Sequence, residues 1–233
     1  MITHILFDFF GTLVEYSDSR IGQGYELSHS IVLSSGVNIK YPEFLERWDA
    51  MFRKFDLAAE ANQDEFSMDD VVNGFLSSVL DKDPTPELVK NFRDVYLQEW
   101  NKGVKTIEGV PELLRQLKGH YTLALVTNTH SGDFVRSHLH DMGIAEHFSA
   151  IVASVEHGKR KPHPSIFELA LEATGGKSEN ALYVGDSFST DYMGAKNVGM
   201  RCLLIDPHKK HDIPPEDRIA HILDLRHILL RNQ

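Results

Sequence analysis

The stretch Ile5-Leu6-Phe7-Asp8-Phe9-Phe10-Gly11-Thr12 (residues 5–12) places a carboxylate directly after a short apolar run. The run does not alternate between apolar and polar residues, which is typical of a strand buried on both faces of a parallel sheet. A carboxylate at the end of such a strand is costly to bury unless it meets a cation or hydrogen-bond donors. Residues 5–12 therefore predict a buried first strand with a polar site at its carboxyl end.

Four further apolar runs of the same kind follow later in the chain and predict four more buried strands. They occupy residues 123–126, 151–153, 181–184 and 202–205. Helical stretches separate the later runs, for example residues 163–174 and residues 190–198. The second stretch ends just before Gly199. Strands that alternate with helices predict an α/β fold with a doubly wound parallel sheet.

Residues 17–100 interrupt this alternation and read as helices. Aromatic residues recur at helical spacing over residues 41–55, and Ser67 with Asp70 resembles a capping box before a second helix. Thr85-Pro86 then opens a third helix. We therefore predict a core domain made of residues 1–16 and 101–233 and an inserted helical cap of residues 17–100, whose aromatic residues form an interior of its own.

Composition narrows the class of protein. The 233 residues include 24 Lys and Arg against 34 Asp and Glu, a formal net charge of −10, which disfavours an extended nucleic-acid-binding surface. The apolar N-terminal run is broken by Asp8 and has no basic segment before it, so it predicts neither a signal peptide nor a membrane span. We expect a cytoplasmic protein in which the single cysteine, Cys202, is a buried core thiol.

The residues that follow the predicted strands carry the chemistry, because ligands of open parallel sheets bind beyond the carboxyl ends of the strands. Asp8, Asp186 and Asp191 could share one Mg²⁺, an ion that prefers oxygen ligands. With a cation present, the Asp8 carboxylate can attack phosphorus and form an aspartyl phosphate. Thr12 follows Asp8 closely enough to orient it through a hydrogen bond.

A transferred phosphoryl group also needs partners for its negatively charged oxygens. Thr127, Asn128 and Lys161 supply a hydroxyl, a backbone N–H and an ammonium. Taken singly, each of these residues could merely cap a turn or lie on the surface. Their order along the strand ends is what predicts a phosphoryl-transfer site.

Four segments resemble the signature motifs of the haloacid dehalogenase superfamily: DFFGT (8–12), VTN (126–128), RKP (160–162) and GDSFSTD (185–191). The resemblance covers essentially the whole chain and implies a Rossmann-like core with a helical cap between the first two motifs. It implies that Asp8 is the nucleophile and that the Phe10 carbonyl, Asp186 and Asp191 help to hold Mg²⁺. It also implies that Thr127 and Lys161 bind phosphate, and most members of the superfamily are phosphatases.

One position departs from the phosphatase pattern. Phosphatases of the superfamily usually carry a second Asp, a general acid and base, where this chain has Phe10. A 2-haloacid dehalogenase, which has a bulky residue there and needs no metal, is therefore an alternative. Against it, such enzymes have a Ser-Ser-Asn run where this chain has Gly185-Asp186-Ser187 and a Tyr where it has Phe167. Asp186 would also repel a substrate carboxylate.

The residues also leave room for a phosphonate hydrolase or for a binding protein. Phosphonate hydrolases of the superfamily lack the second Asp too, but they use a cap lysine, for which Lys54 is the candidate. The binding protein would have kept the fold but lost turnover. His130 and His163 follow site motifs and could contact substrate or supply a proton. The leading prediction is a Mg²⁺-dependent phosphohydrolase that acts on a small phosphorylated metabolite without the usual general acid.

Overall fold

The computed structural model describes residues 1–16 and 23–230. The chain divides into two compact units, a core unit (Met1–Glu15 with Thr106–Gln233) and a cap unit (Tyr16–Lys105). Among the described residues, no helix combines the length and the apolar character that a membrane crossing requires.

The core unit contains a six-stranded sheet in the order β5-β4-β1-β6-β7-β8, and all neighbouring strands are parallel. The strands are β1 (His4–Phe7), β4 (Thr122–Thr127), β5 (Phe148–Ala153), β6 (Ala181–Gly185), β7 (Arg201–Ile205) and β8 (Arg218–Ile219). The order places β1 between β4 and β6, so three of the strands that precede predicted site residues are direct neighbours. The predicted α/β fold with a doubly wound parallel sheet is confirmed.

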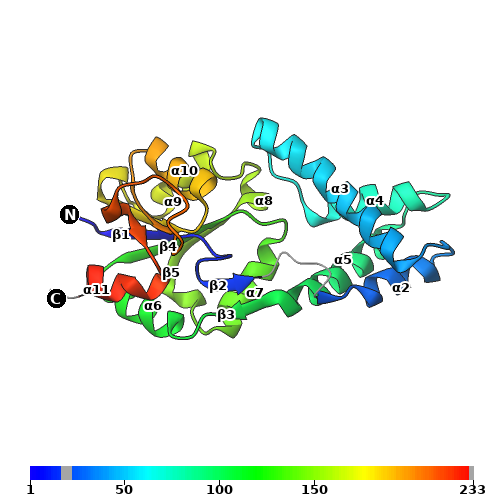
Figure 1. The fold of residues 1–233 in the computed structure, drawn as a ribbon, viewed down its shortest axis with the longest axis horizontal. Coiled ribbons are helices and arrows are strands. Elements are labelled where there is room, and N and C mark those ends of the chain that lie inside the picture. Colours follow the sequence, from blue (N-terminus) through cyan, green and yellow to red (C-terminus); the bar gives the residue numbers. More distant parts are fainter. Residues whose placement is uncertain (17–22, 231–233) are drawn as a thin grey trace. The chain divides into compact units, whose positions relative to one another are not determined.

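Helices cover both faces of this sheet, with α9 and α10 on one side and α6 and α11 on the other (Figure 1). The helices of the core unit are α6 (Val110–Lys118), α7 (Gly132–Asp141), α8 (Ser154–His157), α9 (Pro164–Thr174), α10 (Met193–Asn197) and α11 (Leu225–Leu229). Single helical turns lie between them: η2 (Ala145–His147), η3 (Ser178–Asn180), η4 (Phe188–Tyr192), η5 (Pro215–Asp217) and η6 (Ile222–Asp224). Because both faces are covered, Ile5, Leu6 and Phe7 are all buried, which explains the lack of alternation.

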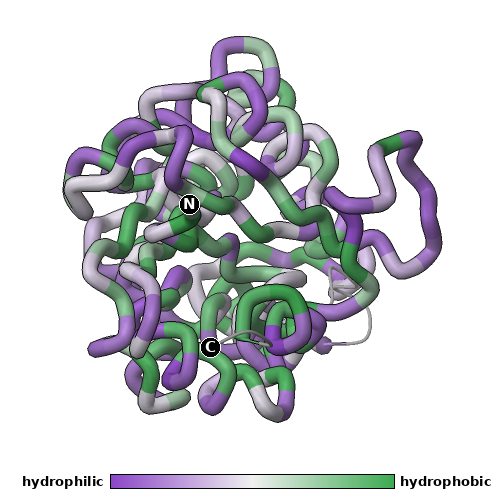
Figure 2. Tube along the Cα trace, turned by 90° about the vertical axis from the view of Figure 1, so that its left-hand side faces the viewer, coloured by the Kyte–Doolittle hydropathy of each residue, from purple (hydrophilic) through white to green (hydrophobic). Residues whose placement is uncertain are grey.

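Hydropathy along the chain follows this layering. In Figure 2 the hydrophobic segments run through the middle of the core unit, and hydrophilic segments form much of its periphery. On one face, Leu6, Ala124 and Tyr183 pair in register and pack with Ile166 and Phe167 of α9. The burial of these side chains fixes the sheet and with it the positions of the strand ends.

The cap unit consists of helices around an aromatic interior. The helices are α2 (Glu26–Ser34), α3 (Tyr41–Asn62), α4 (Met68–Val79), α5 (Pro86–Trp100) and η1 (Asn101–Gly103). The ring of Trp48 is fully buried, 4.6 Å from Tyr96 and 5.1 Å from Phe92 between ring centroids. The predicted capping box of Ser67 with Asp70 is present at the start of α4, as is a Thr85 cap on α5. Helices packed around buried aromatic rings are what the spacing of residues 41–55 predicts.

Several details differ from the sequence prediction. Residues 190–198 are not one helix, because η4 is a π-helical turn that precedes the short α10. The helix predicted over residues 163–174 begins at Pro164, with His163 as its N-cap. Three short strands were not predicted: β8, and the pair β2 (Val14–Tyr16) and β3 (Val104–Thr106), which form a two-stranded sheet with each other. The predicted helical cap begins at residue 17, and its first six residues, 17–22, lie outside those described.

Candidate active site

The ends of the three central strands bring the predicted site residues to one edge of the sheet. Asp8 follows β1, Thr127 is the last residue of β4, and Asp186 follows β6. The Asp8 backbone N–H donates to the carbonyl of Val184, 2.9 Å away, so the β1–β6 ladder extends to the predicted nucleophile itself. Parallel neighbouring strands end at the same edge, so their order alone explains this convergence.

Lys161 joins two of the carboxylates. Its side chain is 2% exposed, and its Nζ donates to Asp8 Oδ1 at 2.7 Å, to Asp191 Oδ1 at 2.7 Å and to the Tyr183 hydroxyl at 2.9 Å. These contacts use all three N–H groups of an ammonium. Burial alone would lower the pKa of Lys161, but the charges of Asp191 and Asp8 raise it overall, so this lysine stays charged.

The π-helical turn η4 sets the position of Asp191. The backbone N–H of Ser187 donates to Asp191 Oδ2 at 3.0 Å, while Ser187 Oγ accepts from the backbone N–H of Thr190 at 3.4 Å. Gly185 is required beside it, since a Cβ there would lie 2.3 Å from Asp191 Oδ2. Single π-helical turns often occur at functional sites, and this one turns a buried carboxylate toward Lys161.

Asp186 adds a third carboxylate to the same place. Asp8, Asp186 and Asp191 each offer an oxygen atom, and these atoms lie within 4.8 Å of one another. Burial, followed by repulsion from Asp191, raises the pKa of Asp8 to about 6 in spite of Lys161. Asp186 is an exposed residue, but neighbouring atoms partly desolvate its carboxylate. This desolvation, followed by repulsion from Asp8 and Asp191, raises the pKa of Asp186 to about 7.

This cluster carries more negative charge than its neighbours neutralise. Like charges that close together favour protonation or the binding of a cation. The donors are hard carboxylate oxygens, and the cluster is open to water at Asp186, which is the environment that Mg²⁺ prefers. The residues present therefore fit a magnesium ion.

A tight turn follows Asp8. The carbonyl of Phe9 accepts hydrogen bonds from the backbone N–H groups of Thr12, Leu13 and Val14. Gly11 has φ +75°, a backbone conformation that favours glycine, and a Cβ at this position would meet Asp186 Oδ2 at 2.1 Å, so a side chain here would also displace that carboxylate. The turn holds residue 10 next to the site.

Phe10 stands where the motif resemblance places a general acid. Its ring is half-buried and packs edge-to-face on the buried ring of Phe9, with ring centroids 4.9 Å apart. A phenyl ring has no proton to donate to a leaving group. Residue 10 therefore supplies no acid.

Two threonines lie buried at the site. Thr127 is fully buried, and its hydroxyl has a long 3.5 Å contact to the carbonyl of Asn128. The expected hydrogen bond from Thr12 to Asp8 is not formed: over the described residues, Thr12 Oγ1 is buried and has no hydrogen-bond partner. The side chain that bonds to Asp8 is that of Lys161.

Asn128 has a second use that the sequence did not indicate. Its side-chain oxygen accepts from the backbone N–H of Lys161 at 2.7 Å, and its amide donates to the Lys161 carbonyl at 3.0 Å. This pair of bonds holds the segment that carries Lys161 against the end of β4. The side-chain amide is thereby engaged, and the backbone N–H of Asn128 remains the group predicted to bind phosphate.

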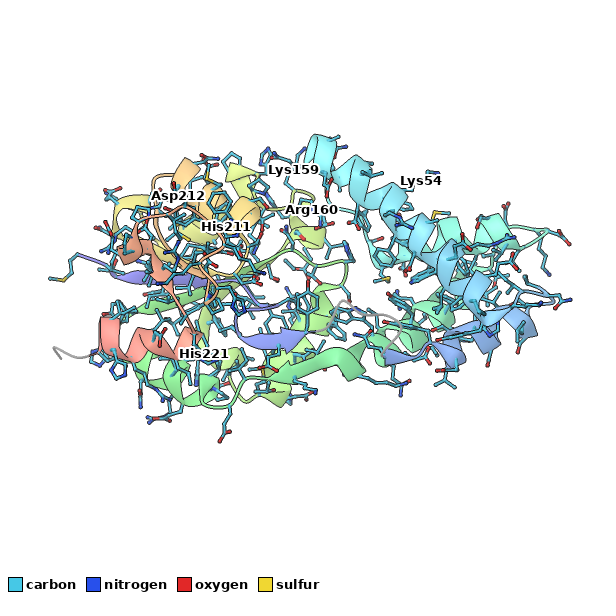
Figure 3. The ribbon with its side chains drawn as sticks, in the orientation of Figure 1. Lys54, Lys159, Arg160, His211, Asp212 and His221 are labelled. Carbon is cyan, nitrogen blue, oxygen red and sulfur yellow. The ribbon has the colours of Figure 1, made fainter. Side chains whose placement is uncertain are left out.

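Two histidines, Lys54 and Cys202 complete the set of residues that the sequence singled out. His163 Nδ1 accepts from the backbone N–H of Ser165 at 3.2 Å, which makes it a helix cap. His130 is half-buried, and its predicted role stays a prediction. Lys54 is exposed on α3 (Figure 3), as expected for a solvated charge. Cys202 is buried, and burial raises the pKa of its thiol, as predicted for a core residue.

Two residues behind the site bear on the dehalogenase reading. Phe167 stands where dehalogenases have a tyrosine, but its Cζ points at Gly194, only 2.7 Å from where a Cβ would be. Phe167 has no hydroxyl to offer to Lys161. The hydroxyl that does reach Lys161 comes from Tyr183 on β6, which the sequence analysis missed. The available signal was a phenol within an otherwise aliphatic strand.

Comparison with known proteins finds related sequences and structures. The sequence model of the haloacid dehalogenase-like hydrolases matches residues 45–205. The chain is 31% identical over 145 residues to a phosphoserine phosphatase of Thermus thermophilus, a match that covers 62% of this chain and 58% of that protein. A ribulose-1,5-bisphosphate 5-phosphatase of Halopiger xanaduensis is 24% identical over 218 residues, which cover 91% of this chain and 88% of the relative.

Among solved structures, a 2-haloacid dehalogenase from Pseudomonas syringae has the same fold, with a TM-score of 0.74 at 23% identity and 99% of each chain covered. At this level of identity the likeness concerns the fold. Several of the curated relatives match over only part of their length, 35% to 58% for the first three. The chemistry therefore has to be argued from the site residues.

Proposed function

We propose, since this chain belongs to the haloacid dehalogenase-like hydrolase family, that it is a Mg²⁺-dependent phosphohydrolase that uses Asp8 as its nucleophile. The single observation that carries the proposal is the arrangement around Asp8. Two further carboxylates and the Lys161 ammonium converge on it, at the edge of the sheet where ligands bind. The names of the relatives, several of them phosphatases, support the same reaction class.

The residues that would hold the ion are Asp8, Asp186 and Asp191, together with the carbonyl of Phe10. When bound, Mg²⁺ would neutralise part of the carboxylate charge and polarise a phosphoryl oxygen. The chain's own residues would then bind and transfer the phosphoryl group.

In the first step, an Asp8 carboxylate oxygen attacks phosphorus, a P–O bond forms to Asp8, and the bond to the departing oxygen breaks. The Lys161 ammonium, the Thr127 hydroxyl and the Asn128 backbone N–H are the groups proposed to bind the phosphoryl oxygens. In the second step, water attacks the same phosphorus and breaks its bond to Asp8. Free phosphate and the Asp8 carboxylate result.

Phe10 shapes the first step. A positioned acid would protonate the departing oxygen, and no such group stands at residue 10. The departing group therefore leaves as an anion or takes its proton from water. Substrates with a stable leaving anion, such as acyl or aryl phosphates, suit this site best.

A dehalogenase, a phosphonate hydrolase and a binding protein are less well supported. A dehalogenase would have to accept a substrate carboxylate beside Asp186, and the phenyl ring of Phe167 offers no hydroxyl there. A phosphonate hydrolase would need a desolvated amine, whereas Lys54 is exposed. A binding protein without turnover would use the same arrangement of site residues as an enzyme. A measurement of activity therefore distinguishes the two.

The testing experiment is a screen of phosphate esters, acyl phosphates, phosphonates and 2-haloacids, each with Mg²⁺ and with excess chelator. We expect phosphate release that requires Mg²⁺ and is greatest for acyl and aryl phosphates. Halide release without metal would instead establish a dehalogenase. A lack of activity on every substrate would favour a binding protein.

A further inference from the structure

Tyr183 crosses the centre of the sheet beneath the proposed site. It lies on β6 in register with Leu6 of β1, yet its hydroxyl lies 2.9 Å from the carbonyl of Val126 on β4. The side chain is fully buried, and its ring packs edge-to-face on Phe167 at 5.2 Å. The phenol thus spans the central strand and ends next to Lys161.

The hydrogen bonds of this hydroxyl are fixed by its single proton. A tyrosine phenol is ordinarily neutral, so this hydroxyl has one proton to donate. Val126 O at 2.9 Å is the nearer acceptor for this proton, and Asp191 Oδ1 is a second acceptor at 3.2 Å. Its oxygen accepts from Lys161 Nζ at 2.9 Å, so the hydroxyl joins the backbone of β4 to the ammonium.

We propose that Tyr183 is a positioning residue that holds the Lys161 ammonium beside Asp8 while the phosphoryl group is transferred. The role in turnover rests on the proposed function. All three N–H groups of Lys161 are engaged, so one bond has to be exchanged before the ammonium can bind a phosphoryl oxygen. We expect the bond to Asp8 to be exchanged, because the Asp8 carboxylate gives up its negative charge as it attacks phosphorus, whereas Asp191 keeps its charge.

Two anchors then remain for the ammonium, Asp191 and Tyr183. Asp191 attracts it by charge but also belongs to the carboxylate cluster. Tyr183 is neutral and is tied to the backbone of β4, so its hold on Lys161 does not change as charge moves in the site. Loss of the hydroxyl would leave the ammonium held at one point and free to tilt.

Tyr183→Phe tests this, with Tyr121→Phe as the matched control. The Tyr121 hydroxyl donates to the Leu229 carbonyl at 3.1 Å in the same unit, just before the start of β4 and so at its opposite end from Val126. Each variant deprives one carbonyl of its phenol donor, but Tyr183→Phe should lower Tm more, because Tyr183 is fully buried and its hydroxyl also accepts from Lys161. We expect kcat to fall about 10-fold to 100-fold in Tyr183→Phe alone. A loss of Tm in Tyr183→Phe with kcat unchanged would make Tyr183 a purely structural residue and overturn the proposal.

A second readout does not depend on activity. In protein labelled with ¹⁵N-lysine, a held ammonium exchanges its protons slowly, so Lys161 should give an NMR signal that disappears in Lys161→Met. We expect this signal to weaken strongly in Tyr183→Phe and to persist in Tyr121→Phe. A signal that is absent from the unsubstituted protein, or unchanged in Tyr183→Phe, would contradict the proposal. If no phosphate ester is hydrolysed, the proposed function fails, while this readout still decides whether Tyr183 holds Lys161.

Discussion

Asp186 and Asp206 stand at equivalent places in the sheet, each one residue after a buried parallel strand, and their surroundings are opposite. Asp206, after β7, accepts hydrogen bonds from the backbone N–H groups of Lys210 at 2.9 Å and His211 at 3.2 Å and pairs with Arg218 at 3.4 Å. Burial tends to raise the pKa of Asp206, but these bonds lower it overall. Asp186, after β6, faces two other carboxylates, and its pKa is raised to about 7.

The cap unit offers a second compensated carboxylate, Glu99 of α5. This side chain is 1% exposed and accepts from the Leu27 N–H at 2.9 Å, the Ser28 N–H at 2.9 Å and the Ser28 hydroxyl at 2.6 Å. These donors lie in the first turn of α2, where the helix dipole favours negative charge. Asp206 and Glu99 are thus compensated by their donors, whereas Asp8 and Asp191 share the ammonium of Lys161 and Asp186 adds a third carboxylate beside them. Surplus negative charge separates the proposed site from these structural carboxylates.

The largest effect on turnover is expected from substitution of Asp8, in contrast to substitution of Asp206. Asp8→Asn removes the nucleophile and should lower kcat by at least about 10⁴-fold, measured as phosphate release with Mg²⁺. Asp206→Asn should lower Tm through its weakened hydrogen bonds and keep turnover. Comparable turnover in Asp8→Asn and the unsubstituted protein would refute the proposed mechanism.

The next largest effect on turnover is expected at Phe10, the apolar residue beside the carboxylate cluster. Without an acid at residue 10, log kcat/KM should fall steeply as the leaving-group pKa rises across a series of phosphate esters at saturating Mg²⁺. A positioned acid contributes about 10² to 10⁴-fold, mainly for basic leaving groups. Phe10→Asp should therefore help alkyl esters most, and Phe10→Leu, which adds no acid, serves as control. A flat dependence in the unsubstituted protein would mean that another group supplies the proton.

A smaller effect is expected for the compensated carboxylate of the cap. Glu99→Gln replaces an acceptor-only group with an amide that presents N–H groups to the donors of α2. The free energy of unfolding should fall by about 1 to 3 kcal/mol, measured by denaturant titration, with faster amide exchange in α2. Exposed Glu87 on the same helix provides the control, since Glu87→Gln should change little. Equal effects of both substitutions would show that the buried hydrogen bonds of Glu99 contribute nothing.

The smallest effect is a pH dependence of stability in chelator. The raised pKa values of Asp8, about 6, and Asp186, about 7, mean that the folded state holds these protons more tightly than the unfolded state. Stability from these groups is therefore greatest near pH 4 and is lost as the pH rises toward 7. Asp186→Asn should gain Tm relative to the unsubstituted protein over this range, and Mg²⁺ should reverse the gain. A difference that does not vary with pH would argue against charge repulsion in the cluster.

The sequence predicted the sheet because its signals are local. Runs such as residues 5–7 and 181–184 are apolar without alternation, and glycine or a carboxylate marks their ends. Asp8 could be predicted as a site residue because it directly follows an apolar run, and Lys161 because it lies in the RKP segment, residues 160–162. Asp206 shows the limit, since it follows its strand just as Asp8 does, and only the hydrogen bonds of the folded chain identify it as structural.

Contacts between distant segments could not be predicted in the same way. Tyr183 reaches Val126 and Lys161 only because β6 and β4 flank β1, a fact of strand order that no local pattern contains. The bonds from Asn128 to the backbone of Lys161 join residues 33 positions apart. The buried hydroxyl of Thr12 depends on how the turn after Asp8 packs.

The most direct test of the account is to trap phosphate on Asp8. An aryl phosphate is turned over with Mg²⁺, the reaction is quenched in acid, and the peptide that contains Asp8 is analysed by mass spectrometry. The account predicts a phosphorylated Asp8 peptide that is absent with chelator and absent from Asp8→Asn. Steady turnover with no phosphoryl group on Asp8 under conditions where hydrolysis of the intermediate limits the rate, or a phosphoryl group on another residue, would contradict it.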